Sequence, residues 1–150
     1  MFAVVAVVIT MSKMATENHE RFVKESILEV QNITKEVNSP EGVLTILKDI
    51  SLTINPGDVT SIVGPSGSGK TTLLAIMAGL DLPTTGTINL LGEEITRVNE
   101  DRRAQVRSKN VGFVFQSFHL LPRLTALDNI MLPLEILGDN QAREKSNICF

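Results

Sequence analysis

The chain lacks the residues on which several classes of site depend. Its 150 residues include no tryptophan, no tyrosine and a single cysteine, Cys149. One cysteine cannot form an internal disulfide, and no group of cysteines and histidines has the spacing of a zinc site. The composition therefore favours a reducing, cytoplasmic compartment. Cys149 is interpreted as part of a frayed terminus rather than as a reactive site.

Charge and hydrophobic runs argue against two further classes. The formal net charge is −3, so no basic surface for nucleic acid is expected. The strongly apolar run at residues 2–9 is much shorter than the ~20 residues that span a bilayer, and it lacks the basic start and small-residue cleavage site of a secretory signal. Because Met11 and Met14 offer later starts, we interpret residues 1–25 as a disordered or wrongly started extension, and residues 26–150 as the folded part.

A phosphate-binding loop is the strongest motif in the chain. Residues 64–72 read GPSGSGKTT, which matches the pattern G-x-x-x-x-G-K-[ST]. An apolar run, Val59–Val63, precedes the loop, and a helical pattern, Lys70–Ala78, follows it, so strand, loop and helix are predicted in the order that this motif needs. The residues predicted to contact a nucleotide here are Gly64, Pro65, Ser66, Gly67, Ser68, Gly69, Lys70, Thr71 and Thr72.

The residue types of this loop suit a polyphosphate. Gly64, Gly67 and Gly69 are predicted to adopt positive φ, so that successive backbone N–H groups converge on one concavity. The helix that begins at Lys70 adds the positive end of its dipole, and the Lys70 ammonium adds a full charge for the outer phosphates. The hydroxyl of Thr71 is predicted to coordinate Mg²⁺, a cation that prefers oxygen ligands.

Two further blocks of sequence narrow the family. Residues 78–88 read AGLDLPTTGTI, and residues 111–135 read VGFVFQSFHLLPRLTALDNIMLPLE. With the loop, they resemble the ATP-binding subunits of ABC transporters, within these the lipoprotein-releasing and macrolide-exporting type, over residues 26–138. The resemblance implies an α/β fold: a P-loop NTPase core of ABC ATPase type with an antiparallel β flank, incomplete at the C-terminus. Residues 26–150 would be the N-terminal part of a nucleotide-binding domain.

The resemblance also implies ligands, partners and a location. ATP and Mg²⁺ would be bound, a membrane permease would be the partner, and a second ATP-binding subunit would complete a homodimer, with no role for nucleic acid. The protein would be cytoplasmic and peripheral, held at the inner face of the cell membrane through its permease. The intact protein would couple ATP binding and hydrolysis to transport through that permease.

Three residues take their interpretation from the resemblance. Gln116 matches the Q-loop glutamine, which reaches toward Mg²⁺ and the attacking water; a glutamine that merely ends a strand is the alternative. Val37 stands where the family has an aromatic residue that stacks on adenine, so a weaker contact with the base is expected. His119 lies within the Q-loop block rather than at the family's late histidine position, and it is interpreted as a loop residue.

Several family motifs have no match after Gln116: the LSGGQ-type signature, the Walker B strand with its Asp and Glu, and the late histidine. Lys70 and Gln116 remain as catalytic candidates, and we expect ATP binding without useful hydrolysis. The tail Asn147–Phe150 fits no family pattern, which indicates a frameshift, a truncated reading frame or a gene-model error. Two alternatives stay open. The first is a non-hydrolysing nucleotide-binding regulatory module. The second is an unrelated phosphate-loop kinase or GTPase, and the Q-loop block and the lack of an NKxD motif disfavour this second alternative.

The remaining pattern predicts alternating strands and helices. Strands are expected at residues 27–30, 43–47, 50–54, 87–91 and 111–115, with antiparallel hairpins in the first part and a turn at 55–58. A helix is expected at residues 99–109, with Arg102, Arg103, Arg107 and Lys109 on a solvated face. Thr125–Asp128 resembles a capping box that begins another helix, which Pro133 bends or stops and Gly138 closes.

Overall fold

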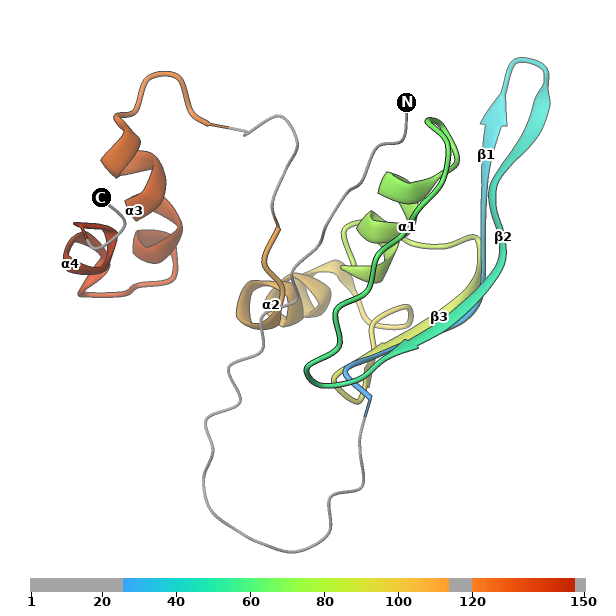
Figure 1. Cartoon of the computed structure of the whole chain (residues 1–150), viewed down its shortest axis with the longest axis horizontal. Coiled ribbons are helices and arrows are strands. Elements are labelled where there is room, and N and C mark those ends of the chain that lie inside the picture. Colours follow the sequence, from blue (N-terminus) through green and yellow to red (C-terminus); the bar gives the residue numbers. More distant parts are fainter. Residues whose placement is uncertain (1–25, 114–119, 148–150) are drawn as a thin grey trace, which may run out of the picture. The chain divides into compact units, whose positions relative to one another are not determined.

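The computed structural model describes residues 26–113 and 120–147 (Figure 1). The predicted N-terminal extension, Gln116, His119 and Cys149 lie outside the described residues. The chain divides into two compact units, residues 1–114 and residues 115–150. The phosphate-binding loop belongs to the first unit.

An antiparallel sheet forms much of the first unit. β1 (Leu28–Ser39) pairs with β2 (Gly42–Ile54) in a long hairpin and with β3 (Thr85–Leu90) on its other edge, and β3 pairs with the short β4 (Glu93–Glu94). The order in the described part of the chain is β2-β1-β3-β4. The predicted antiparallel hairpin is confirmed. The runs predicted at 43–47 and 50–54 form one continuous strand, because both pair with β1.

The hairpin bends where its pairing shifts. The register of β1 against β2 changes on both sides of Ile33, and Asn32 and Asp49 nearby have φ of 50° and 51°. The Asn32 side-chain amide donates to the Asp49 carboxylate at 2.8 Å, which ties the two left-handed residues together. Gly86 of β3 packs on this bend, since a Cβ built there would lie 2.5 Å from the Asn32 carbonyl oxygen. Bulges of this kind bend and twist a strand.

Two helices share one core with the sheet. α1 (Lys70–Met77) and α2 (Glu100–Asn110) agree with the predicted helices to within a residue at each end. α1 buries Leu73, Ile76 and Met77, the i, i+3, i+4 spacing of one helix face. The cluster that they join contains Ile27, Leu28, Val30, Ile33, Leu47, Ile54, Ile88, Leu90, Ile95 and Val106.

The turn predicted from the sequence is confirmed, and the helix predicted at residues 99–109 begins with a side-chain cap. The turn at residues 55–58 is closed by the Asp58 N–H, which donates to the Asn55 carbonyl oxygen at 3.1 Å. At the start of α2, Asn99 Oδ1 accepts from the Arg102 N–H at 2.9 Å, an N-cap that satisfies one of the helix's unpaired donors. Acidic residues occupy the first turn of α2 and basic residues its last turn, as the helix dipole favours.

The predicted solvated basic face of α2 is wrong for two of its four residues. Arg103 is buried and Arg107 is half-buried, while the other two are exposed. Both guanidinium groups donate to Glu100, and Arg107 also donates to the Gly79 carbonyl oxygen at 2.6 Å. Long basic side chains bury their apolar stems when the charged group keeps a partner. The charge pattern alone therefore did not reveal which side of the helix packs.

The strand predicted at Val59–Val63 is wrong. Residues 59–63 have no regular secondary structure, and the side chains of Val59 and Val63 are 97% and 70% exposed. Ile62 is the residue of this run that packs against the core. A strand needs a neighbour for its backbone groups, and a parallel neighbour arrives only after a long crossover connection. No strand in the described part of the chain pairs with this run.

The strand predicted at residues 111–115 is also not observed in the part of this run that the structure describes. Residues 111–113 have no regular secondary structure, and the rest of this run lies outside the described residues. Val111 still packs against the core cluster.

The second unit contains α3 (Ala126–Ile136) and α4 (Ala142–Asn147). The predicted capping box is confirmed, with bonds in both directions between Thr125 and Asp128. Pro133 was predicted to bend or stop the helix, and it does not stop it, because α3 continues for three more residues. A proline removes one N–H donor from the helix, and the bend stays a prediction. Gly138 follows the helix end with φ of 74°. Within the described ranges, no helix combines the length and apolar character needed to cross a membrane.

Candidate phosphate-binding site

The candidate site lies at the N-terminal end of α1, where residues 64–69 lead into the helix (Figure 1). The Leu73 N–H donates to the Gly69 carbonyl oxygen at 2.8 Å, which is the first bond of the helix. The loop residues Pro65–Ser68 are exposed. The loop and the helix are therefore present as predicted, although the chain enters the loop from an irregular segment rather than from a strand.

The N-terminus of α1 is open to an anion. Its N-cap residue, Gly69, provides no side-chain cap, and no acidic residue lies in the first turn. The first N–H groups of an α-helix have no carbonyl partner within the helix, and the helix dipole adds partial positive charge at the same end. A phosphate would satisfy these donors without displacing a capping side chain.

The three loop glycines are required for two different reasons. Gly67 and Gly69 have φ of 81° and 82°, which confirms the prediction for these two. Gly64 does not have positive φ, so the prediction is wrong there. A Cβ at Gly64 would instead lie 2.8 Å from Ser68 Oγ, because the loop folds back on itself at this point. Gly69 is crowded as well, since a Cβ there would lie 2.9 Å from Leu47 Cδ2.

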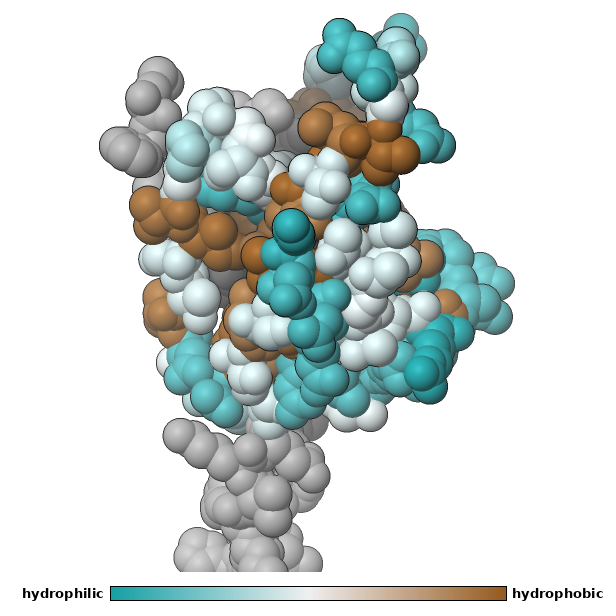
Figure 2. All heavy atoms as spheres, turned by 90° about the vertical axis from the view of Figure 1, so that its right-hand side faces the viewer, coloured by the Kyte–Doolittle hydropathy of each residue, from teal (hydrophilic) through white to brown (hydrophobic). Residues whose placement is uncertain are grey.

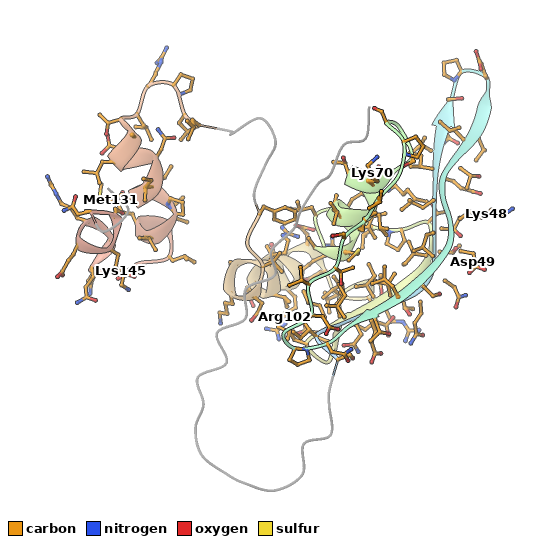
Figure 3. The ribbon with its side chains drawn as sticks, in the orientation of Figure 1. Lys48, Asp49, Lys70, Arg102, Met131 and Lys145 are labelled. Carbon is orange, nitrogen blue, oxygen red and sulfur yellow. The ribbon has the colours of Figure 1, made fainter. Side chains whose placement is uncertain are left out.

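The Lys70 ammonium lies inside the loop. The residue is only 7% exposed, and its Nζ donates to the carbonyl oxygens of Gly64 at 2.9 Å and Pro65 at 2.6 Å (Figure 3). A third, longer bond reaches Ser68 Oγ at 3.4 Å. These three acceptors match the three donors of an ammonium group. All three acceptors are uncharged, and Lys70 forms no ion pair with any residue that the structure describes, so its positive charge lies unpaired beside the open end of α1.

Thr71 and Thr72 lie on the first turn of α1. Thr71 is exposed and Thr72 is half-buried. No group of three or more His, Cys, Asp or Glu side chains that could hold a metal ion occurs in residues 26–113 or 120–147. A Mg²⁺ ion here would take its oxygen ligands from the Thr71 hydroxyl and from phosphates. Hydroxyl and phosphate oxygens are hard ligands of the kind that Mg²⁺ prefers, and the ion usually keeps several waters in such sites.

Val37 lies on the hairpin that passes the loop. It is half-buried on β1, and its pairing partner on β2 is Leu44. Farther along β2, the Ile46 carbonyl oxygen lies 3.0 Å from a Cβ built at Gly69. The fold therefore brings β2 and the phosphate-binding loop side by side. Gln116 lies outside the described residues, so the predicted roles of Val37 and Gln116 remain predictions.

Sequence reasoning missed a clamp between β1 and the segment that follows α1. Lys35 Nζ donates to Asp81 Oδ1 at 2.9 Å and to the Leu82 carbonyl oxygen at 2.7 Å. Thr84 Oγ1 accepts from the Glu36 N–H at 2.9 Å. Burial raises the pKa of Asp81, but hydrogen bonds from Lys35 and from the Leu82 N–H outweigh it and hold the pKa below its ordinary value. No sequence signal links residues so far apart.

Comparisons with known proteins agree on a single protein family. The family model described as ABC transporter matches residues 47–148. The uncharacterized ABC transporter ATP-binding protein YbbA of Escherichia coli strain K12 is 44% identical over 122 residues, 81% of this chain and 54% of YbbA. The lipoprotein-releasing system ATP-binding protein LolD of Geobacter metallireducens is 47% identical over 113 residues, 75% of this chain and 50% of LolD. The chain thus spans about half the length of the curated relatives it matches.

A solved structure supports the fold. The ATP-binding cassette MJ0796, solved as a dimer in a post-hydrolysis state bound to ADP and Pi, superposes with a TM-score of 0.72 at 33% identity, over 81% of this chain and 55% of MJ0796. This confirms the predicted α/β P-loop fold of ABC ATPase type. The match to LolD confirms the predicted resemblance to the lipoprotein-releasing type. Because the family model covers more than half of the chain and the relatives exceed 40% identity, the chain belongs to the ABC transporter family.

Proposed function

We propose that this chain binds Mg·ATP through residues 64–72, as part of the nucleotide-binding domain of an ABC transporter. The observation that carries the proposal is the charge of Lys70, buried among uncharged acceptors beside the uncapped N-terminus of α1. A triphosphate supplies the negative charge that Lys70 lacks and acceptors for the uncapped N–H groups of α1. The solved relative MJ0796 has ADP and Pi bound, which supports a nucleotide as the ligand.

Within this proposal, each residue of the loop has a role. The N–H groups at the start of α1 bind phosphate oxygens, and Lys70 binds the outer phosphates. Thr71 contributes its hydroxyl oxygen to Mg²⁺, and Gln116 reaches toward the same ion. When bound, Mg²⁺ neutralises part of the phosphate charge. Val37 lies toward the base.

The proposal extends to partners and location. The protein would act at the inner face of the cell membrane, held there by a permease, and would pair with a second ATP-binding subunit. The relatives' names, an ABC transporter ATP-binding protein and the ATP-binding protein of a lipoprotein-releasing system, support a permease partner. The dimeric structure of MJ0796 supports a second subunit. Residues 26–150 would be the N-terminal part of the nucleotide-binding domain, and transport coupled to ATP hydrolysis would belong to the whole protein.

Isothermal titration of the full chain with Mg·ATP tests the loop assignment. Substituting Lys70→Ala removes the full charge of the loop, and we expect at least about a tenfold loss of affinity, the effect of one charged hydrogen bond. Lys48→Ala is the matched control, because Lys48 is an exposed lysine of β2 that points away from the loop (Figure 3). Equal affinities of wild type and Lys70→Ala would contradict the proposal.

A turnover measurement complements the titration. The 150 residues contain no sequence match to the family's Walker B Asp and Glu, so we expect phosphate release at the background rate. Release clearly above background that Lys70→Ala removes would show that the chain supplies a complete hydrolytic site by another route.

A further inference from the structure

The contacts of Lys35 connect the β1–β2 hairpin with the segment that follows α1. Lys35 lies on β1 opposite Leu47 of β2, and cross-strand partners of this kind place their side chains on the same face of a sheet. The Lys35 side chain is only 17% exposed. Its ammonium group donates to the Asp81 carboxylate at 2.9 Å and to the Leu82 carbonyl oxygen at 2.7 Å. Lys35 thus reaches out of the hairpin toward α1.

The cross-strand partner of Lys35 contacts the start of α1. The buried Leu47 side chain packs on Gly69, since its Cδ2 atom lies 2.9 Å from a Cβ built there. The Ile46 carbonyl oxygen lies 3.0 Å from the same position. Gly69 is the N-cap residue of α1 and belongs to the phosphate-binding loop. The hairpin therefore touches the helix at the end where phosphate is proposed to bind.

Backbone hydrogen bonds tie Asp81 to the other end of α1. The N–H groups of Leu80 and Asp81 both donate to the Ala75 carbonyl oxygen, at 2.8 and 3.3 Å. Ala75 lies in the last turn of the helix. A single cross-strand pair consequently contacts α1 at both ends, Leu47 at its start and Lys35, through Asp81, just after its last turn.

The outer part of the hairpin lies beyond this attachment. Val43 and Leu44 of β2 are 65% and 55% exposed, whereas Leu47 is 6% exposed. Figure 2 shows the hydrophilic tip of the hairpin with hydrophobic residues just below it. Segments with few buried apolar contacts open most readily. Because Lys35 lies where the exposed part of the hairpin meets the packed part, its bonds oppose movement of the strands away from α1.

We propose that Lys35 is a positioning residue for the phosphate-binding loop. By its bonds to the segment after α1, it keeps Leu47 against Gly69 and holds the start of α1 ready for phosphate before a ligand binds. The proposal rests on the phosphate binding proposed above and adds a residue that does not itself touch the ligand. A loop already held in its binding conformation loses less conformational entropy on binding, so its affinity is higher.

Titration of the full chain with tripolyphosphate and Mg²⁺ tests this role, because tripolyphosphate has no base and reports on the loop alone. Lys35→Met keeps the length of the side chain but removes its charge and its donors. We expect at least about fivefold weaker binding, the lower end of typical coupling between two sites. Lys35→Arg keeps the charge and the donors, and it should restore most of the affinity. Equal affinities of wild type and Lys35→Met would overturn the inference and leave the phosphate site standing.

Two matched variants separate positioning from loss of charge and from loss of an ion pair. Lys48→Met removes a lysine from the same hairpin, and Lys48 is exposed and points away from the loop (Figure 3). Arg102→Met breaks the 2.7 Å ion pair that Arg102 forms with Glu93 between α2 and β4. Both should leave tripolyphosphate binding nearly unchanged, because salt screens exposed charges. A loss in either control as large as that of Lys35→Met would overturn the inference.

Amide hydrogen exchange in the ligand-free chain gives a local readout. The Leu73 N–H donates to the Gly69 carbonyl oxygen at 2.8 Å, the first bond of α1. The Val111 N–H donates to the Arg107 carbonyl oxygen at 2.9 Å, at the end of α2. In Lys35→Met we expect faster exchange at Leu73 and unchanged exchange at Val111. Equal acceleration at both amides would indicate general destabilisation and overturn the positioning role.

A second variant decides the matter if Lys35→Met does not fold. Asp81→Ala removes one of the two acceptors of Lys35 and leaves the Leu82 carbonyl oxygen, so we expect weaker tripolyphosphate binding but a smaller loss. In that case, an affinity equal to that of wild type would overturn the inference.

Failure of the proposed function gives a different result. If wild type binds no tripolyphosphate while its circular dichroism shows a folded sheet, the phosphate site itself is wrong, and the inference about Lys35 is overturned with it.

Discussion

The β1–β2 hairpin and the segment before the loop, residues 59–63, are both rich in valine and isoleucine, yet they differ in structure. The hairpin strands pair along their length and bury Val30 and Ile33 almost completely. The segment before the loop has no regular secondary structure and leaves Val59 and Val63 to solvent. The unpaired segment is no less apolar than the paired hairpin, so composition does not account for the difference.

The two regions differ in how far along the chain the pairing partner of each strand lies. β1 finds β2 after a turn of two residues, so closing the hairpin costs little chain entropy. A strand at residues 59–63 would belong to a parallel arrangement, whose neighbours arrive only through crossover connections. The chain spans about half the length of its curated relatives. Local pairing therefore accounts for the β1–β2 hairpin, whereas the phosphate-binding loop is followed by helix α1 but is not preceded by a strand.

The largest loss of stability is expected from a substitution that disturbs the bend in β1 of the hairpin. Gly86→Ala places a Cβ about 2.5 Å from the backbone oxygens of Gln31 and Asn32, at a φ of 94°, and we expect a loss of at least about 3 kcal/mol in the free energy of unfolding. Gly92→Ala is the control, because a Cβ added at Gly92 has no atom within 4 Å. Its φ of 82° therefore adds backbone strain alone, about 1–2 kcal/mol. Urea unfolding measures both, and similar losses would show that the bend in β1 is not tightly packed.

Replacing a valine by alanine in each region compares how much the two regions contribute to stability. Val30→Ala removes methyl groups from a side chain that is 2% exposed, and we expect a loss of about 1.5–3 kcal/mol. Val63→Ala acts on an exposed side chain and should change stability by less than about 0.5 kcal/mol. Thermal unfolding followed by circular dichroism compares them. A large loss for Val63→Ala would mean that residues 59–63 are packed in solution.

A related expectation concerns exposed surface. Val59 and Val63 should contribute to binding of a hydrophobic dye, and the double variant Val59→Ser and Val63→Ser should reduce dye fluorescence while leaving the unfolding temperature nearly unchanged. Undiminished fluorescence would locate the accessible apolar surface elsewhere in the molecule.

The smallest effect concerns pH. Hydrogen bonds from Arg107 and then Arg103 lower the pKa of Glu100 below its ordinary value of 4.5. A carboxyl whose pKa is lower in the folded state stabilises the fold above its unfolded pKa, and that stabilisation is lost as the pH falls through the folded pKa. We expect the unfolding temperature to fall on acidification below about pH 4.5, and to fall less in Glu100→Gln. An identical acid response in both proteins would show that Glu100 does not contribute.

The sequence predicted much of the fold where the signals are local. The capping box at Thr125 and the turn at residues 55–58 each depend on a few neighbouring residues, and both are confirmed. The prediction failed at residues 59–63 and at Arg103 because strand pairing and burial depend on distant neighbours. The positive φ predicted for Gly64 failed for a similar reason, since contact with Ser68 rather than φ requires glycine there.

By itself, the sequence determined the family and the position of the phosphate-binding loop, because a loop of nine consecutive residues followed by a helix carries its geometry locally. Only the tertiary structure decided that the Lys70 ammonium lies buried among uncharged acceptors and that β2 runs beside Gly69. It also decided that Lys35 clamps β1 to the segment after α1. The last two arrangements join residues far apart in the chain, and such contacts form only when the whole unit packs. The burial of Lys70 is local in sequence, but it depends on how residues 64–68 fold back over the ammonium group.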